Sequence, residues 1–177
     1  DTTTLSGQVS KAQDTRGWGT WTRVNYDLRE GRLAVYSLYI PSRSDSNDTG
    51  LWKMMEGKLN KERTREDRDP KLAALNDLMS DVDKQIQGTK IVVLTDANMV
   101  WSEAGKQTTL TSEDRAYMRV LRRKCEERGL KNAFEERHQG TAGWTYEGGG
   151  GIHTAIDMVL VSENILESKA VKAIGIM

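Results

Sequence analysis

The chain has 177 residues, a length that predicts a single domain, and its 26 basic side chains balance 26 acidic ones. Zero net charge gives no bulk argument for nucleic-acid binding, although it does not exclude a local basic groove. No apolar run approaches the roughly 20 residues that cross a bilayer, the N-terminus lacks a signal-peptide core, and one cysteine cannot form an internal disulfide. We therefore expect an intracellular location, nuclear or cytoplasmic, with no membrane partner and with Cys125 as a small core residue rather than a nucleophile.

The first part of the chain predicts a loop and a hairpin. Residues 1–15 are polar and without periodicity, so we expect a surface loop there. From Thr20 to Leu28 apolar and polar positions alternate, as in a half-buried strand, and residues 32–41 are apolar on both faces, as in a central strand. The short connection between these two segments predicts a hairpin.

Three helices are predicted from the spacing of apolar residues. The second is well delimited, since Asp69 can cap its N-terminus, Pro70 suits its first position and Gly88 suits its end. The third spans about Ser112–Arg128 and ends at Gly129. The positions expected to face inward are Trp52, Met55 and Leu59, then Leu72, Leu75, Met79, Val82 and Ile86, and finally Met118, Leu121 and Cys125.

Further strands complete the pattern. An apolar strand begins at Lys90, and residues 154–162 and 169–177 predict two more. A glycine-dense stretch at 138–151 surrounds one short β-like piece, and the dense mixture of charges at 60–71 is typical of a solvated surface. The order of strands and helices predicts an α/β fold built as a layered sandwich with mixed β-sheets.

Two carboxylates stand out against the apolar strands. Asp96 and Asn98 directly follow the apolar run Ile91–Leu94, and ligands bind beside the carboxyl ends of strands in open α/β sheets. Asp and Asn are also turn formers, so this pair alone can be interpreted as a simple strand stop. Asp157 interrupts the apolar strand at 154–162, where a carboxylate needs a partner or a function.

Three motifs in this order resemble those of the endonuclease/exonuclease/phosphatase superfamily, which includes exonuclease III-type abasic-site nucleases, pancreatic-type deoxyribonucleases and LINE-type retroelement endonucleases. LYIPS at 38–42 resembles the family's Tyr-x-Pro strand end, LTDAN at 94–98 its Gly-Asp-x-Asn, and TAIDMVLVS at 154–162 its Ser-x-Ile-Asp-Tyr-Ile-Leu. Residues 130–146 resemble the family's Leu-x-Asp stretch and the aromatic-Thr-aromatic loop after it. The resemblance covers the chain from about Gly19 to its end.

The sequence also departs from the family pattern. The departures within the motifs are Thr95 for glycine, Ala97 for the usual Phe, and Met158 where an aromatic residue is common. The family's metal-binding Glu belongs upstream of this sequence and its Ser-Asp-His motif beyond it, and neither His138 nor His153 lies in that context. We therefore expect residues 1–177 to form a partial, deoxyribonuclease-like domain that is weak or inactive by itself.

The resemblance implies a chemical task for each motif residue. Asp96 would orient or deprotonate the attacking water, and Asn98 would hold that water or donate to a phosphate oxygen. Asp157 would accept a hydrogen bond from a histidine and stabilise the charged form of that histidine. Tyr39 would donate its hydroxyl to the phosphate or to the leaving group. The resemblance implies Mg²⁺ or Mn²⁺ as the cofactor and leaves its ligands in this sequence unassigned.

Four further residues are candidates for contacts with nucleic acid. Arg43 is placed to meet a phosphate, although a solvated loop arginine explains it equally well. Trp144, Thr145 and Tyr146 form a loop whose aromatic rings could stack on a base or enter a groove, or could lie at the edge of the core. The arginine-rich helix around Arg122 fits a solvated helix face better than a binding surface.

The resemblance therefore implies a metal-dependent phosphodiesterase that hydrolyses nucleic acid, with DNA favoured over RNA. Its expected context is the endonuclease domain of a larger, mobile-element-like polypeptide. Two alternatives stay open, because fold alone does not decide function. One is a phosphatase for small phosphoesters, and the other is a non-catalytic scaffold or binding domain of the same fold.

Overall fold

The computed structural model describes residues 10–29, 31–43, 50–61, 68–138 and 143–167. The strand expected at 169–177, part of the charged stretch at 60–71 and the first nine residues lie outside these ranges. The strands are β1 (Ser10–Gln13), β2 (Trp21–Leu28), β3 (Gly31–Tyr39), β4 (Thr89–Asp96), β5 (Leu130–Asn132), β6 (Tyr146–Glu147), β7 (His153–Thr154) and β8 (Asp157–Ser162). The helices are α1 (Leu51–Lys61), α2 (Pro70–Gln85), α3 (Ser112–Glu126), α4 (Ala133–Arg137) and α5 (Glu163–Glu167), with a 3₁₀ turn at Glu103–Gly105.

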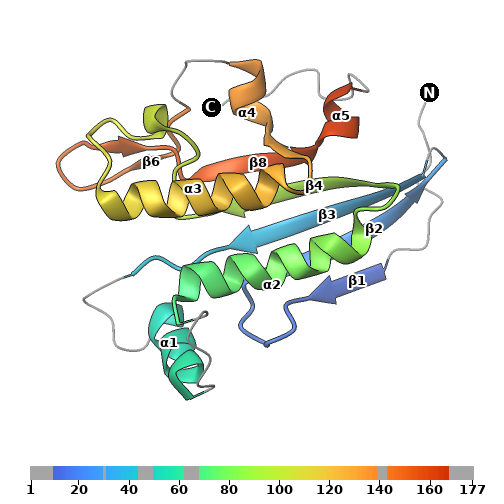
Figure 1. The fold of residues 1–177 in the computed structure, drawn as a ribbon, viewed down its shortest axis with the longest axis horizontal. Coiled ribbons are helices and arrows are strands. Elements are labelled where there is room, and N and C mark those ends of the chain that lie inside the picture. Colours follow the sequence, from blue (N-terminus) through green and yellow to red (C-terminus); the bar gives the residue numbers. More distant parts are fainter. Residues whose placement is uncertain (1–9, 30, 44–49, 62–67, 139–142, 168–177) are drawn as a thin grey trace.

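A six-stranded mixed sheet in the order β1-β2-β3-β4-β8-β5 forms the centre of the molecule (Figure 1). Its β3 and β4 are parallel, and its other neighbouring strands are antiparallel. The predicted α/β class with a mixed sheet is therefore confirmed. The chain leaves β3, forms α1 and α2, and returns as β4, so both strands end at the same edge of the sheet.

The expected loop at 1–15 is wrong for Ser10–Gln13, which forms the edge strand β1. An edge strand needs no apolar alternation, since its backbone pairs with one neighbour and its side chains can face water. Lys11 and Gln13 are exposed accordingly. The polar composition of this segment therefore hid a strand whose backbone pairs with β2.

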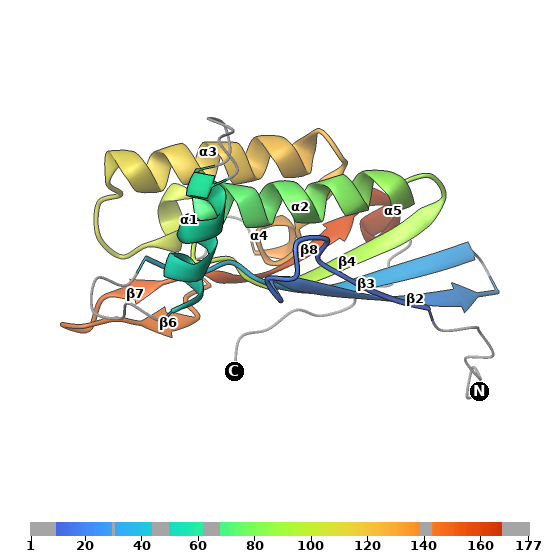
Figure 2. The ribbon, with the colours of Figure 1, turned by 90° about the horizontal axis from the view of Figure 1, so that it is seen from below.

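One face of the sheet is covered by α1, α2 and α3 (Figure 2). Tyr36 of β3 and Val93 of β4 are fully buried against this layer, together with Leu75 of α2 and Leu121 of α3. Cys125 is also fully buried, and burial raises the pKa of its thiol to about 12, so it is an inert core residue as expected. These apolar contacts fix the strand ends that carry the site.

The helix boundaries follow from local hydrogen bonds. The Asp69 carboxylate accepts the backbone N–H groups of Lys71 and Leu72 and so caps α2. Thr111 and Asp114 form a reciprocal capping box at the start of α3. Gly88 and Gly129 have positive φ values of 72° and 60°, a conformation that glycine adopts without strain, and each precedes a strand. No helix among the described ranges is long and apolar enough to cross a membrane.

The described residues cover the opposite face of the sheet less completely. A smaller apolar cluster joins Ala133, Val161 and Ile165, with the partly buried Leu33, Val92, Val159 and Leu166 around it. Further along β4, toward its carboxyl end, Leu94 keeps 48% of its surface exposed. This part of the sheet is therefore accessible, and it adjoins the predicted site.

Candidate active site

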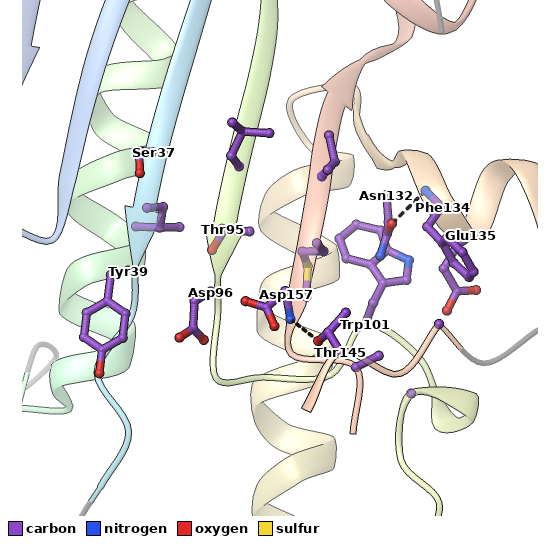
Figure 3. Close-up of a pocket in the computed structure, with 17 residues that line it drawn as sticks. Ser37, Tyr39, Thr95, Asp96, Trp101, Asn132, Phe134, Glu135, Thr145 and Asp157 are labelled. Atoms are coloured by element: carbon purple, nitrogen blue, oxygen red, sulfur yellow. Dashed lines mark hydrogen bonds between the residues drawn. The ribbon is translucent and has the colours of Figure 1, made fainter. Parts of the chain in front are cut away.

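Three of the four predicted catalytic residues form one row across the sheet. Tyr39 at the end of β3 is the register partner of Asp96 at the end of β4, and Asp96 is in turn the partner of Asp157 at the start of β8. Figure 3 shows the two carboxylates side by side at the strand ends, with that of Asp157 directed toward Asp96 and the ring of Tyr39 on the other side of Asp96. Residues 39, 96 and 157 thus come together from three strands through strand register alone.

The two carboxylates of this row repel each other. Like charges directly opposite on neighbouring strands destabilise a sheet, so this pair is not explained by stability. The pKa of Asp96 is raised, first by burial and then by the charge of Asp157, while the N–H of Asn98 and the ammonium of Lys71 oppose the rise. Perturbed carboxylates of this kind cluster at functional sites.

Residues 96–98, here named the Asp96 turn, are held by several hydrogen bonds. The Asn98 N–H donates to Oδ1 of Asp96 (3.2 Å), and Nδ2 of Asn98 donates to the carbonyl of Ile40 (2.7 Å). Asn98 has a φ of 47°, a left-handed conformation that asparagine tolerates better than most residues. Asn98 therefore serves as a turn former that joins the ends of β3 and β4, and its side chain already bonds within the protein.

Asp157 is held differently, in a segment named here the Asp157 corner (residues 145 and 156–157). The Thr145 hydroxyl accepts the backbone N–H groups of Ile156 (3.2 Å) and Asp157 (3.0 Å). The carbonyl of Ile156 accepts the N–H of Ala97, which links the corner to the Asp96 turn. The Asp157 side chain itself is exposed. Thr145, predicted as a nucleic-acid contact, thus supports the backbone of Asp157.

A cavity of about 550 Å³ opens beside the row, on the less covered face of the sheet. Its lining includes Tyr39, Asp96, Thr145 and Asp157 (Figure 3). Sequence reasoning missed the members of the lining that come from β5, α4 and the segment after the Asp96 turn, which are Asn132, Phe134, Glu135 and Trp101. Their segments are too short or irregular to show a period, so only the folded arrangement identifies them.

The remaining predicted contacts lie outside this row. Trp144 and Tyr146 are 40% and 54% exposed at the hairpin of β6 and β7, so they are not part of the buried core. Trp144 stacks on His153 with ring centres 5.1 Å apart. Arg43 is exposed and does not line the cavity. Arg122 is paired with Glu126 on the exposed side of α3, as expected for a solvated face.

The described residues do not by themselves form a metal centre. They contain no group of three or more His, Cys, Asp or Glu side chains that could hold an ion. Asp96 and Asp157 offer oxygen atoms of the kind that Mg²⁺ accepts, but two opposed carboxylates do not define a coordination shell. The residues present are therefore insufficient to assign the metal that the fold implies.

Comparisons with known proteins identify the fold. No family model and no curated protein sequence matches the chain. Among solved structures, it is similar to an AP endonuclease from Archaeoglobus fulgidus (14% identity, TM-score 0.55, 91% of this chain and 60% of that one). It is also similar to the 3'-5' exonuclease NExo from Neisseria meningitidis (16% identity, TM-score 0.50, 82% of this chain and 54% of that one). A third similar structure is the 3' phosphatase NExo from Neisseria bound to a product DNA hairpin (16% identity, TM-score 0.51, 82% of this chain and 53% of that one).

The chain spans between 53% and 60% of the length of these three structures. At identities of 14% to 16%, the likeness concerns the backbone arrangement and not the chemistry. Together with the mixed sheet and its helical layer, it shows that the chain has the fold of the endonuclease/exonuclease/phosphatase superfamily.

Proposed function

We propose that the row of Tyr39, Asp96 and Asp157 is the protein part of a phosphodiester-cleaving site that acts on nucleic acid. The observation that supports this most is the strand register, which sets two carboxylates opposite each other at an open sheet edge. A protein that needed only a stable sheet would not keep such a repulsive pair. Because the chain spans little more than half of the matched structures, the activity is proposed for the protein that carries it.

Each residue has a role that its surroundings support. Asp96 acts as general base or orienting acceptor for the attacking water, and burial with the nearby Asp157 raises its pKa, which makes it a stronger base. Tyr39 is exposed beside Asp96 and can donate its hydroxyl to a phosphate oxygen or to the leaving group. Asp157 presents an exposed carboxylate that can accept from an imidazole. Asn98 supports Asp96 through the turn.

A divalent cation, Mg²⁺ or Mn²⁺, is part of the proposal because of the fold. When bound, such an ion would absorb charge on the phosphoryl oxygens. The described residues assign no ligand set to it.

Two exposed aromatic side chains favour nucleic acid over a small phosphoester. Tyr146 belongs to β6 and Trp144 lies two residues before it, and the β6–β7 hairpin lies at the end of the sheet where β3 and β4 finish (Figures 1 and 2). Stacking of a base on an aromatic ring contributes roughly 1 to 3 kcal/mol, whereas a small phosphoester offers no base to stack. The NExo structure with a product DNA hairpin shows a protein of this fold that binds DNA.

The proposal is tested by nicking of plasmid DNA with Mg²⁺ or Mn²⁺, by the 177-residue chain and by a longer polypeptide that carries it. Asp96→Ala should lower turnover by about 100- to 10,000-fold, the range of general acid-base catalysis. The matched control is Asp27→Ala, because Asp27 is an exposed carboxylate near the turn of the β2–β3 hairpin, at the other end of the sheet. Equal rates for Asp96→Ala and the wild type would remove Asp96 from the mechanism.

The substrate class is tested with the same proteins. Binding of DNA should weaken steeply as salt rises, because contacts to phosphates release counterions. Cleavage of a small phosphoester without cleavage of DNA would favour the phosphatase alternative. Salt-sensitive DNA binding without cleavage, even in the longer polypeptide, would favour the scaffold.

A further inference from the structure

Lys71 lies in the first turn of α2, behind the Asp96 turn. Its Nζ donates to the carbonyl oxygen of Asn98 at 2.7 Å and lies 4.8 Å from the centre of the Tyr117 ring of α3. Tyr117 in turn donates its hydroxyl to the carboxylate of Asp69. The ammonium is therefore partly enclosed between two helices and the turn that presents Asp96.

Helix stability does not explain a lysine at this position. The first turn of a helix favours acidic residues, because the N-terminal end of the helix dipole is positive. Burial also disfavours the ammonium and lowers the pKa of Lys71, while the carboxylates of Asp69, Glu113, Asp114 and Asp96 act in the opposite direction. A positive charge is thus retained here against two unfavourable effects, which points to a role in the neighbouring turn.

The contact of Lys71 completes the set of bonds on Asn98. The N–H of Asn98 bonds to Asp96, its side chain bonds to Ile40, and its carbonyl accepts from Lys71. A non-glycine residue with a φ of 47° is kept in place by such surrounding contacts. Because the first of these bonds goes to Oδ1 of Asp96, holding Asn98 also orients the Asp96 carboxylate.

We propose that Lys71 is a positioning residue of the candidate active site, which holds the Asp96 carboxylate in its reactive orientation by bonding to the carbonyl of Asn98. Its kinetic consequences rest on the proposed function, while its structural consequences do not. Lys71 acts through Asn98 and its charge, and it does not itself touch the reacting phosphate.

The charge of Lys71 gives the inference a direction that can be measured. Three groups act on Asp96 besides burial: Asp157 from β8 raises its pKa, and the N–H of Asn98 and Lys71 from α2 lower it. Removing the ammonium takes away one of the two opposing influences. The pKa of Asp96 should therefore rise further when Lys71 becomes neutral.

The first test uses the 177-residue chain and needs no activity. Lys71→Met keeps the aliphatic stem and removes the charge, Lys71→Arg keeps a charged donor, and Lys84→Met, exposed in the last turn of α2, is the matched control. By carboxyl ¹³C NMR, the titration midpoint of Asp96 should move to higher pH in Lys71→Met, with backbone shifts confined largely to residues 96–98. In Lys71→Arg and in the control Lys84→Met, the Asp96 midpoint and the backbone shifts should stay near their wild-type values. An unchanged titration midpoint of Asp96 together with unchanged backbone shifts in Lys71→Met would overturn the proposal. If the methionine variant does not fold, Lys71→Gln replaces it in the same measurement.

The second test uses the nicking assay. Lys71→Met should lower kcat by roughly 10- to 100-fold, the scale of a small misplacement, and leave KM nearly unchanged. The acidic limb of its pH profile should move to higher pH, and Lys71→Arg should restore most of the rate. If the wild type cleaves DNA and Lys71→Met does so with the same rate and pH profile, the positioning role is wrong. If the NMR effects appear but no protein cleaves DNA, the positioning role stands and the proposed function fails.

Discussion

The two carboxylates of the row are held in place by different means. In the Asp96 turn, the half-buried carboxylate accepts the backbone N–H of Asn98, and Asn98 is held in turn by bonds to Ile40 and from Lys71 of α2. In the Asp157 corner, the Thr145 hydroxyl fixes the backbone and leaves the carboxylate exposed. Asp96 is thus oriented before any ligand arrives, as expected of a group that meets the reacting water, whereas Asp157 stays open to a further partner.

Among the changes at these two segments, Asp157→Asn should have the strongest effect, a loss of turnover. We expect a loss of about 100-fold or more, because the variant can no longer accept from an imidazole as a carboxylate does. It also removes a like charge that raises the pKa of Asp96. The acidic limb of the remaining activity should therefore move to lower pH, opposite to the shift expected for Lys71→Met.

A pH profile of nicking by Asp157→Asn and by the control Asp27→Asn checks this prediction. If the acidic limb of the pH–rate profile of Asp157→Asn stays in place or moves to higher pH, the two carboxylates do not interact as the register indicates. Wild-type turnover in Asp157→Asn would remove Asp157 from the reaction.

A smaller effect is expected on stability when Asn98 is replaced. Asn98→Ala should lower the free energy of unfolding by about 2 kcal/mol, since it loses the bond to Ile40 and places an ordinary residue in a left-handed conformation. Asn98→Gly loses only the bond and should cost about 1 kcal/mol. Urea unfolding of both variants, with Asn60→Ala at an exposed position of α1 as control, measures the difference. Equal costs for alanine and glycine would show that the turn is not left-handed in solution.

The smallest effect is expected at the Asp157 corner. Thr145→Val removes the acceptor for two backbone N–H groups and should cost about 1 kcal/mol, because water can replace part of the loss near an exposed residue. Thr145→Ser keeps the hydroxyl and should stay within about 0.5 kcal/mol of the wild type. A serine variant as unstable as the valine variant would mean that the methyl group, and not the hydroxyl, holds this corner.

Periodic patterns and caps were sufficient to predict the parts of the fold with strong local signals. The hairpin of β2 and β3, the three long helices and the strand that ends in Asp96 all follow from spacing, with Asp69 and Gly129 at helix ends. Asp157 was recognised because a carboxylate stands within an apolar run of the sequence, although the strand β8 begins at Asp157 and does not extend before it. The catalytic roles of these site residues stay predictions.

Features that depend on contacts between distant segments were not predictable from the sequence. The strand β1 is polar and is defined by its pairing with β2. The residue-for-residue opposition of Asp96 and Asp157, as distinct from their meeting at one end of the sheet, depends on a register between strands about 60 residues apart in the chain. Lys71 looked like one of many charged residues near a solvated stretch, and only the folded chain brings its ammonium to Asn98.

A nucleic acid should meet the protein at the row of Tyr39, Asp96 and Asp157. The most direct measurement is chemical-shift mapping on the labelled chain with a short DNA duplex in the absence of divalent metal, repeated at rising salt. We expect the largest chemical-shift changes at residues 39, 96, 144–146 and 157, and we expect them to fade as salt increases. Chemical-shift changes that centre instead on α1 or on β1, with the row unaffected, would show that nucleic acid binds away from the row.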